Sequence, residues 1–201
     1  MAWDSDAHMV RDRDAGGHNL AVGDPEFLRG VYRGFYPAQI ADWDFDLGYP
    51  ESKPLAFLRT ELEYLHPGQQ VVVTIGAKQA LSAAIHAMTT RTGRKSVWAP
   101  VPHWPSLPTL TENLGLDWCP GSLSDDIKIV TSPNNPDGYQ YGMPADIHDA
   151  CYCSPVYGWH GWSPDAHIRV WSAGKLLGCP GVRVGWATTQ DLELARFMTQ
   201  Y

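Results

Sequence analysis

The sequence predicts an α/β fold of three layers, in which a mostly parallel sheet carries helices on both faces. Two observations lead to this prediction. Short apolar segments alternate with helical segments along most of the chain, which is the pattern of strands joined by crossover helices. Most of the apolar segments are continuous runs rather than alternating ones, as is typical of strands that are buried on both faces.

The amino-terminal part of the chain is expected to contribute an arm and two helices. Met1–His18 is polar and charged without periodicity, which predicts a flexible arm. Pro25–Phe35 has the pattern of a short helix with Asp24 as its N-cap. Leu55–Leu65 follows Pro54 and repeats leucine at helical spacing, so it predicts a clear helix.

The middle of the chain alternates strands and helices. Gln70–Ile75 is a β-branched apolar run, which predicts a strand, and Ala77–Thr90 has the pattern of an amphipathic helix. Lys95–Pro100 predicts a second strand, and Pro105–Asn113 predicts another helix. Ile127–Ser132 predicts a third strand, which ends in a cluster of proline, asparagine and glycine.

The carboxyl-terminal third predicts three more strands and a final helix. The strands are expected at Ala145–Asp149, Ile168–Ser172 and Val182–Thr188. Asp191–Tyr201 has a helical pattern that continues to the last residue. The segment Tyr139–Ala145 is too short to hold more than a loop.

Charge and hydropathy exclude some classes of function. The 201 residues carry a formal net charge of 15 − 22 = −7, which argues against a nucleic-acid partner or an anionic membrane surface. The sequence holds no apolar run long enough to span a bilayer and no secretory signal. We therefore expect a cytoplasmic protein that associates with neither nucleic acid nor membrane.

The four cysteines do not form a disulfide framework or a zinc-ribbon spacing. Cys151 and Cys153 could together hold a metal, but no second pair of ligands accompanies them. We expect reduced thiols and no metal.

The segment Ser172-Ala-Gly-Lys175 places a lysine on a glycine-rich turn. A lysine that loses solvent there lowers its pKa and becomes an amine nucleophile for a carbonyl. Ser172 and Arg183 are suited to bind an anion beside it. An amine, a hydroxyl and a guanidinium together suggest a phosphorylated aldehyde, with pyridoxal 5′-phosphate as the obvious choice. A surface lysine in an ordinary turn is the alternative.

Other polar residues also follow predicted strands, and ligands bind at the carboxyl ends of strands in open α/β sheets. Gly76-Ala77 opens a helix, whose free N–H groups bind phosphate. Asp149 could pair with a protonated pyridine nitrogen, and the phenol of Tyr152 with a ring oxygen. Trp104 could stack on a flat ring. Each residue alone is more simply a turn, a cap or a core residue, but together with Asn135 they indicate one shared site.

The chain resembles the fold-type I, pyridoxal-phosphate-dependent aminotransferases of class I/II, and its Ser132–Gly138 segment and the short step from there to Asp149 are similar to their alliinase and tryptophan-aminotransferase branch. The resemblance covers residues 19–201. The segments that carry it are Asn19-Leu-Ala-Val-Gly-Asp-Pro25, Val73-Thr-Ile-Gly-Ala-Lys-Gln-Ala80, Pro102-His-Trp104, Ser132-Pro-Asn-Asn-Pro-Asp-Gly138, Asp149-Ala-Cys-Tyr152 and Ser172-Ala-Gly-Lys175 with Pro180-Gly-Val-Arg183-Val-Gly-Trp186.

The resemblance implies a role for each matching residue. Lys175 would form the Schiff base with pyridoxal 5′-phosphate and then move the proton on the substrate. Asp149 would hold the ring nitrogen protonated, while Asn135 and Tyr152 would bond the ring oxygen. Trp104 would stack on the ring. The residues implied for the phosphate are Gly76, Ala77, Ser172 and Arg183.

Three further residues are implied less directly. Gly23 resembles the glycine beside the substrate carboxylate. Tyr49 resembles the tyrosine that reaches the other subunit's phosphate, which implies a homodimer. Lys78 stands in the phosphate segment where relatives often carry an uncharged polar residue, so its role is open.

The resemblance implies an aminotransferase that moves an amino group between an amino acid and a 2-oxo acid. The chain is about half as long as the family leads one to expect, so we expect residues 19–201 to form the cofactor-binding large domain with the carboxyl-terminal small domain missing. No residue matches the family's substrate-carboxylate arginine. Another pyridoxal-phosphate reaction, β-elimination or decarboxylation, and a non-catalytic interaction protein are the alternatives.

Overall fold

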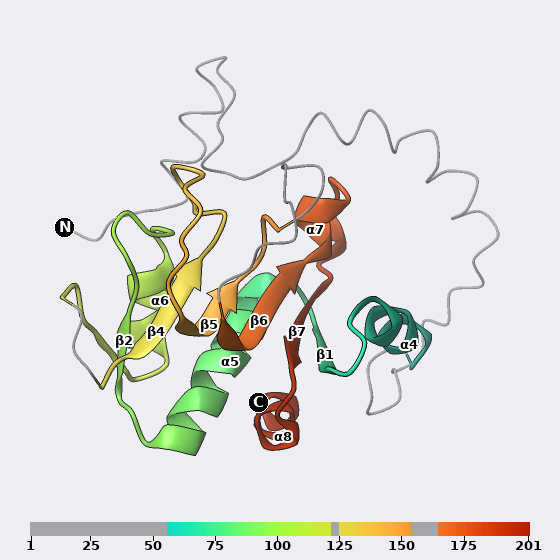
Figure 1. Cartoon of the computed structure of the whole chain (residues 1–201), viewed down its shortest axis with the longest axis horizontal. Helices are drawn as coiled ribbons and strands as arrows, with labels where there is room; N and C mark the ends of the chain where they lie inside the picture. The colour runs from blue at the N-terminus through green and yellow to red at the C-terminus, as the bar shows by residue number, and fades with distance from the viewer. Residues whose placement is uncertain (1–55, 122–124, 154–164) are drawn as a thin grey trace, which may run out of the picture.

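The computed structural model describes residues 56–121, 125–153 and 165–201, which form a seven-stranded sheet with helices on both faces (Figure 1). The strands are β1 (Gln70–Thr74), β2 (Ser96–Trp98), β3 (Asp117–Trp118), β4 (Ile127–Thr131), β5 (Ala145–Asp149), β6 (Ala166–Ser172) and β7 (Gly185–Thr189). The helices are α4 (Ala56–Leu65), α5 (Ala77–Thr92), α6 (Leu107–Asn113), α7 (Ala173–Leu176) and α8 (Leu192–Gln200), with a short 3₁₀ turn, η3 (Pro180–Val182).

The strand order is β1-β7-β6-β5-β4-β2-β3. Strands β3, β2, β4, β5 and β6 pair in parallel, whereas β7 is antiparallel to both of its neighbours, β6 and β1. Within the described sheet, β7 alone therefore runs against the other strands. The predicted mostly parallel α/β fold is confirmed. The two-residue strand β3 was not expected, because two residues carry no periodic signal.

The larger core lies between the sheet and α5. Half of the buried residues of α5 are alanines, including Ala80, Ala84 and Ala87, which are fully buried. Small side chains let the helix axis approach the strands closely, so that Ile129 and Ile147 of the sheet pack into the same cluster. Helices α6 and α8 also contribute to this cluster. In the part of the chain that the structure describes, no helix combines the length and apolarity needed to cross a membrane.

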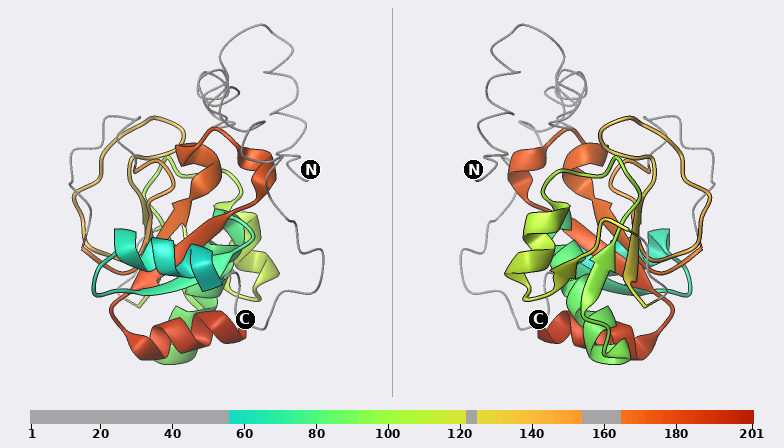
Figure 2. Two further views of the ribbon diagram at one scale, coloured as in Figure 1. Left: turned by 90° about the vertical axis from the view of Figure 1, so that its right-hand side faces the viewer. Right: turned by 90° about the vertical axis from the view of Figure 1, so that its left-hand side faces the viewer.

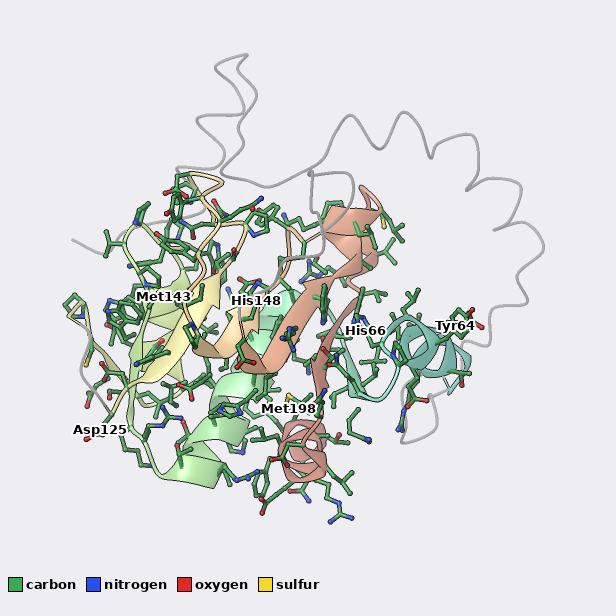
Figure 3. All side chains as sticks on the ribbon, in the orientation of Figure 1. Tyr64, His66, Asp125, Met143, His148 and Met198 are labelled. Carbon is green, nitrogen blue, oxygen red and sulfur yellow. The ribbon has the colours of Figure 1, made fainter. Side chains whose placement is uncertain are left out.

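A smaller core lies under α4, on the other side of the sheet (Figure 2). Leu62 of α4 packs against Val71 of β1 and Trp186 of β7. The Trp186 ring stacks on Trp171 at 6.2 Å between centroids, and its Nε1–H donates to Nε2 of His66 at 3.0 Å. Figure 3 labels His66 between α4 and the strands. This core fixes the edge of the sheet where β1 and β7 lie.

An ion pair joins strands at the end of the sheet opposite their carboxyl ends. Arg94 donates to both carboxylate oxygens of Asp146 at 2.7 and 2.9 Å, and the backbone N–H of Lys128 donates to the same carboxylate. A bidentate pair of this kind fixes both distance and orientation. It holds the start of β5 against β4 and the segment before β2.

The predicted boundaries need two corrections near the last strand. We expected a strand over Val182–Thr188, but it begins at Gly185, because Pro180-Gly181 start the η3 turn instead. Arg183 is therefore in a turn rather than on a strand, with φ 60° and ψ 44°. The loop expected over Tyr139–Ala145 is confirmed up to the start of β5. The expected arm, Met1–His18, and the helix Pro25–Phe35 lie outside the described residues.

His148 should make the folded chain less stable in mild acid. Its buried ring donates from Nε2 to the carbonyl oxygen of Ser132 at 2.8 Å, and burial lowers its pKa from 6.5 to about 4. The neutral ring of His148 makes its full contribution to the free energy of unfolding above pH 6.5. This contribution is lost as the pH falls from 6.5 toward 4, because the unfolded chain binds a proton more readily than the buried ring does. His148 then lowers the free energy of unfolding by up to roughly 1.4 kcal/mol per pH unit in this window.

Urea unfolding of the wild type, His148→Gln and the exposed control His167→Gln measures this slope. The difference between wild type and His148→Gln should grow smaller as the pH falls, while the control should follow the wild type. Parallel pH curves for wild type and His148→Gln would contradict the assignment.

Candidate active site

The candidate site lies at the edge of the sheet where β4, β5 and β6 end and α5 begins, which is the upper edge in Figure 1. The chain leaves β6 at Ser172 and turns at once into the four-residue helix α7, which carries Lys175. Ser172 is the N-cap of α7, and its Oγ accepts the N–H of Lys175 at 3.4 Å. The cap begins the helix directly at the strand end, and so holds the lysine at the edge of the sheet.

Burial changes the chemistry of Lys175. It lowers the pKa of the amine, and the positive charge of Arg183 lowers it further, whereas Cys151 and the carboxylate of Asp149 oppose the shift. Nζ lies 5.8 Å from the centre of the Tyr152 ring. The neutral, nucleophilic amine is therefore more accessible than for a lysine in water.

Asp149 presents a buried carboxylate at the end of β5. Burial raises its pKa, while hydrogen bonds and the nearby charge of Lys175 favour the ionised form. The backbone N–H of Cys151 donates to Oδ1 at 3.1 Å, and the hydroxyl of Thr131 donates to Oδ2 at 3.4 Å. A carboxylate held in this way is positioned to accept a further charged donor.

The loop after β4 brings Asn135 to Tyr152, and Nδ2 of Asn135 donates to the Tyr152 hydroxyl at 3.5 Å. The neighbouring Asn134 fixes this loop, because its Nδ2 donates to the carbonyl oxygen of Pro102 at 2.9 Å and to Asp137 at 2.8 Å. The bond to Pro102 also ties the loop to the segment that carries Trp104.

The start of α5 is packed tightly against the turn before β7. Gly76 has φ 114°, a conformation that favours glycine, and a Cβ built there would lie 2.5 Å from Nη2 of Arg183. A Cβ on Gly185 would lie 2.5 Å from the backbone nitrogen of Ala77. Only glycines allow the guanidinium and the helix start to meet here.

The groups at the start of α5 fit an anion. No side chain caps the helix, and its first turn holds no acidic residue. The N–H groups of the first turn of α5, the Arg183 guanidinium and the nearby Lys78 are all donors, which suits a phosphate. With the amine of Lys175 and the carboxylate of Asp149, the described residues fit a phosphorylated aldehyde that carries a basic ring nitrogen.

A cavity of about 130 Å³ lies beside this site. It extends toward α4, and its walls include His66, Trp171 and Trp186 together with Cys151 and Leu176. The stacked tryptophans of the smaller core thus also form a wall of the space next to the helix of Lys175.

The structure brings together most of the residues that the sequence singles out. Lys175, Asp149, Tyr152 and Asn135 form one group by the contacts given above. A second group lies at the start of α5 and is formed by Gly76, Ala77, Lys78, Trp104 and Arg183. Ser172 adjoins it, because it pairs with Gly185, which packs against Gly76 and Ala77. Gly23 and Tyr49 lie outside the described residues.

Three residues of the site were not expected from the sequence. Thr131 and Cys151 hold Asp149, and Gly185 admits the start of α5. Thr131 and Gly185 stand at strand ends, which is a usable but weak signal, since many strand ends carry such residues. The bond from Cys151 is made by its backbone, so its side chain gives no sign of it.

Gly185→Ala should destabilise the fold much more than Gly181→Ala. A methyl group on Gly185 meets backbone atoms that cannot rotate away, whereas a Cβ on Gly181 has nothing within 4 Å. We expect Gly185→Ala to cost about 2 kcal/mol or more. Urea unfolding of both variants measures the difference, and equal stabilities would show that the two segments do not pack as closely as described.

Comparison with known proteins places this site in a family. The family model Alliinase_C, described as "Allinase", matches residues 65–201. Tryptophan aminotransferase-related protein 2 from Arabidopsis thaliana is 33% identical over 147 residues, which cover 65% of this chain and 33% of the relative. Tryptophan aminotransferase-related protein 1 from Oryza sativa subsp. japonica is 26% identical over 215 residues, which cover 91% of this chain and 49% of the relative.

The fold agrees with that of solved aminotransferases. Tyrosine aminotransferase from Leishmania infantum superposes with a TM-score of 0.61 at 16% sequence identity, and the match covers all of this chain and 71% of the other. The chain spans between about a third and a half of the length of the curated relatives described above. The family implies pyridoxal 5′-phosphate as cofactor. The chain belongs to the alliinase family, within the fold-type I pyridoxal-phosphate-dependent enzymes.

Proposed function

We propose that the chain is a pyridoxal-phosphate-dependent aminotransferase, which moves an amino group from an amino acid to a 2-oxo acid. One observation carries the proposal: a lysine with a lowered pKa and a buried carboxylate meet at the edge of the sheet where the strands end. Pyridoxal 5′-phosphate, when bound, supplies an electron-accepting ring that makes the Cα–H of an attached amino acid acidic.

Asp149 and its partners would set the charge at the ring nitrogen. The carboxylate stabilises a proton there by a charge-assisted hydrogen bond. The bonds from Thr131 and from the Cys151 N–H hold the carboxylate in place. Asn135 and Tyr152, which already contact each other, would bond the ring oxygen. Trp104 would stack on the ring.

Lys175 would serve twice. Its Nζ would hold the cofactor through the aldehyde, and the same amine, when it is not attached, would take the proton from Cα of the substrate. Burial favours both roles, because it lowers the cost of the neutral amine. The phosphate would be held by Gly76, Ala77, Ser172 and Arg183. Its attachment there would keep the lysine and the substrate at a fixed distance and orientation.

The proposal extends to two residues outside the described part of the chain. Gly23 would lie beside the substrate carboxylate, and Tyr49 would reach the phosphate of a second subunit in a homodimer. The four cysteines are free thiols, which supports a reducing compartment such as the cytoplasm.

Lys175→Ala should abolish the attachment of the cofactor. Purified wild type mixed with pyridoxal 5′-phosphate should absorb visible light and, after borohydride reduction, carry the cofactor on Lys175 in peptide mass spectra. The control Lys128→Ala, on β4, should behave as wild type. A reduced adduct that persists in Lys175→Ala would rule out the proposed role.

A screen of amino donors then separates the possible reactions. Conversion of the bound cofactor to pyridoxamine 5′-phosphate, with release of a 2-oxo acid, supports transamination. Release of pyruvate with ammonia would instead identify elimination, and release of carbon dioxide would identify decarboxylation. A wild type that holds the cofactor but responds to no amino acid would contradict the proposed activity.

Asp149→Asn should slow the reaction while the chain still binds the cofactor. The amide has nearly the same shape but no charge, so it stabilises a protonated ring nitrogen far less. We expect the half-reaction with an amino donor to slow by roughly 100-fold or more, the scale seen when one preorganised electrostatic partner is removed. Stopped-flow absorbance measures this rate, and a rate within a factor of about three of wild type would argue against Asp149 as the partner of the ring nitrogen.

A further inference from the structure

We propose that His66 is a positioning residue of the candidate site: its neutral imidazole accepts the indole N–H of Trp186 and so holds the base of the hairpin formed by residues 173–184. That hairpin carries Lys175 and Arg183. The inference deepens the proposed function and rests on it, because it concerns the same site. His66 acts through the strands and has no part in the chemistry assigned above to the cofactor.

His66 lies just after the end of α4, between that helix and the strands (Figure 3). Its backbone N–H donates to the carbonyl oxygens of Leu62 and Glu63 at 3.1 and 3.2 Å, which ties the residue to the helix. Nε1–H of Trp186 donates to its Nε2 at 3.0 Å. The centre of the imidazole lies 4.9 Å from that of the Trp171 ring and 6.0 Å from that of the Trp186 ring. One side chain therefore contacts a tryptophan on each of two neighbouring strands.

The bond from Trp186 sets the charge of the imidazole. An indole N–H can only donate, so Nε2 of His66 must accept, which requires a neutral ring with its proton on Nδ1. A protonated imidazole carries N–H groups on both nitrogens and loses this bond. Burial lowers the pKa of His66 below 6.5, and the positive charge of Arg169 on β6 lowers it further. The neutral ring that the bond requires is thus the stable form at neutral pH.

The charges around His66 support the same state. Among the described residues, Arg169 is the charged group that shifts its pKa, and no carboxylate favours the charged ring. Strands β1 and β7 contain no ionisable residue, and burial raises the pKa of the two thiols across the cavity, which stay uncharged. Protonation of the ring therefore requires acid. The ionisable groups on the surrounding elements are Arg59, Glu61, Glu63 and Tyr64 on α4, His167 and Arg169 on β6, Lys175 on α7, and the thiols of Cys151 and Cys153.

The tryptophans that His66 contacts lie directly next to the site. Trp171 and Trp186 are partners in the register of β6 and β7, and the adjoining pair is Ser172 with Gly185. Ser172 ends β6 and caps the helix of the lysine, while Gly185 begins β7 and packs against the start of α5. The bond to His66 thus fixes the hairpin one residue pair away from both of these contacts.

The cavity beside the site makes this bond more important than it would be in a filled core. Trp171 and Trp186 both border the space of about 130 Å³, whose walls also include residues of α4 and α7. Dispersion contacts are lost where neighbouring atoms are missing, so packing does not hold the rings on every side. The indole N–H of Trp171 donates to Thr188 of β7 at 3.0 Å, within the same pair of strands. Of the two indole bonds, the one to His66 is therefore the one that anchors the pair to a different element.

Two substitutions separate the hydrogen bond from the size of the side chain. Leucine in His66→Leu accepts no hydrogen bond, whereas the amide oxygen in His66→Gln accepts one at any pH. Hydrogen exchange of residues 173–184, measured by mass spectrometry on the full chain at neutral pH, should be roughly 5-fold faster in His66→Leu, the scale of one neutral hydrogen bond. His66→Gln should stay close to wild type, and β4 should exchange equally in all three proteins.

Mild acid should have the same effect on the wild type. The contribution of the neutral ring is complete above pH 6.5 and is lost as the pH falls through the lowered pKa of His66. In this range the indole proton resonance of Trp186, identified by its loss in Trp186→Phe, should move, and the hairpin should exchange faster in wild type than in His66→Gln. The exposed control on β6, His167→Gln, should follow the wild type.

Attachment of the cofactor connects this contact with the proposed function. At neutral pH the visible absorbance with pyridoxal 5′-phosphate should develop about 5-fold more slowly in His66→Leu, by the same loss of one hydrogen bond. His66→Gln should recover the rate of wild type.

Four results would overturn the inference. They are unchanged hairpin exchange in His66→Leu, an increase that extends equally to β4 and so reflects the whole fold, the same acid response in wild type and His66→Gln, and attachment of the cofactor that His66→Leu does not slow. The exchange and the indole resonance need no cofactor. A wild type that attaches no pyridoxal 5′-phosphate would therefore contradict the proposed function, while these two measurements still decide whether His66 holds the hairpin.

Discussion

The close approach of two backbones holds the site together. The first residue of β7, Gly185, lies against the peptide that joins Gly76 to Ala77, with no room for a side chain between them. This contact brings the start of α5 to the turn that carries Arg183. A third glycine, Gly174, makes a similar approach inside α7, where a Cβ would lie 2.8 Å from Cα of Pro180. The positions of Lys175 and Arg183 relative to the helix start follow from these two contacts.

The charges of the polar groups in the site depend on how this packing buries them. A buried carboxylate and a buried amine each lose hydration, so each is pushed toward its neutral form. Their proximity opposes this, because the charge of one favours the charge of the other. Asp149 ends β5 and Lys175 lies on the helix that directly follows β6, and because these two strands pair with each other, the sheet holds the two groups near each other.

The fold class and most of the candidate site could be predicted from the sequence because their signals are local. Continuous apolar runs such as Val71–Val73 and the leucine spacing of α4 identify their elements without knowledge of the partners. Glycine, asparagine and aspartate at or just after the end of a strand identify where it stops. Because ligands bind at the carboxyl ends of strands in open α/β sheets, Gly76, Asn135 and Asp149 are then expected at one edge of the sheet.

What could not be predicted depends on contacts between distant segments. The strand β3 exists through pairing with β2 and has too few residues for a pattern. The turn at Arg183 replaced the first three residues of the expected strand Val182–Thr188, because Pro180 and Gly181 just before it start a turn that continues to Arg183. Thr131 and the Cys151 N–H take part in the site because they donate hydrogen bonds to Asp149. The identity of a residue does not show where its hydrogen bonds are directed.

The reversed direction of β7 has a consequence for how the site forms. Because β6 and β7 are antiparallel neighbours, residues 173–184 are the tip of a hairpin, and Lys175 and Arg183 both lie on it. Contacts between residues close in sequence need little loop closure, so they form more readily than pairings across the sheet. The spacing between the amine and the guanidinium is thus a local property of one hairpin, whereas the carboxylate that completes the site must be brought to it by long-range pairing.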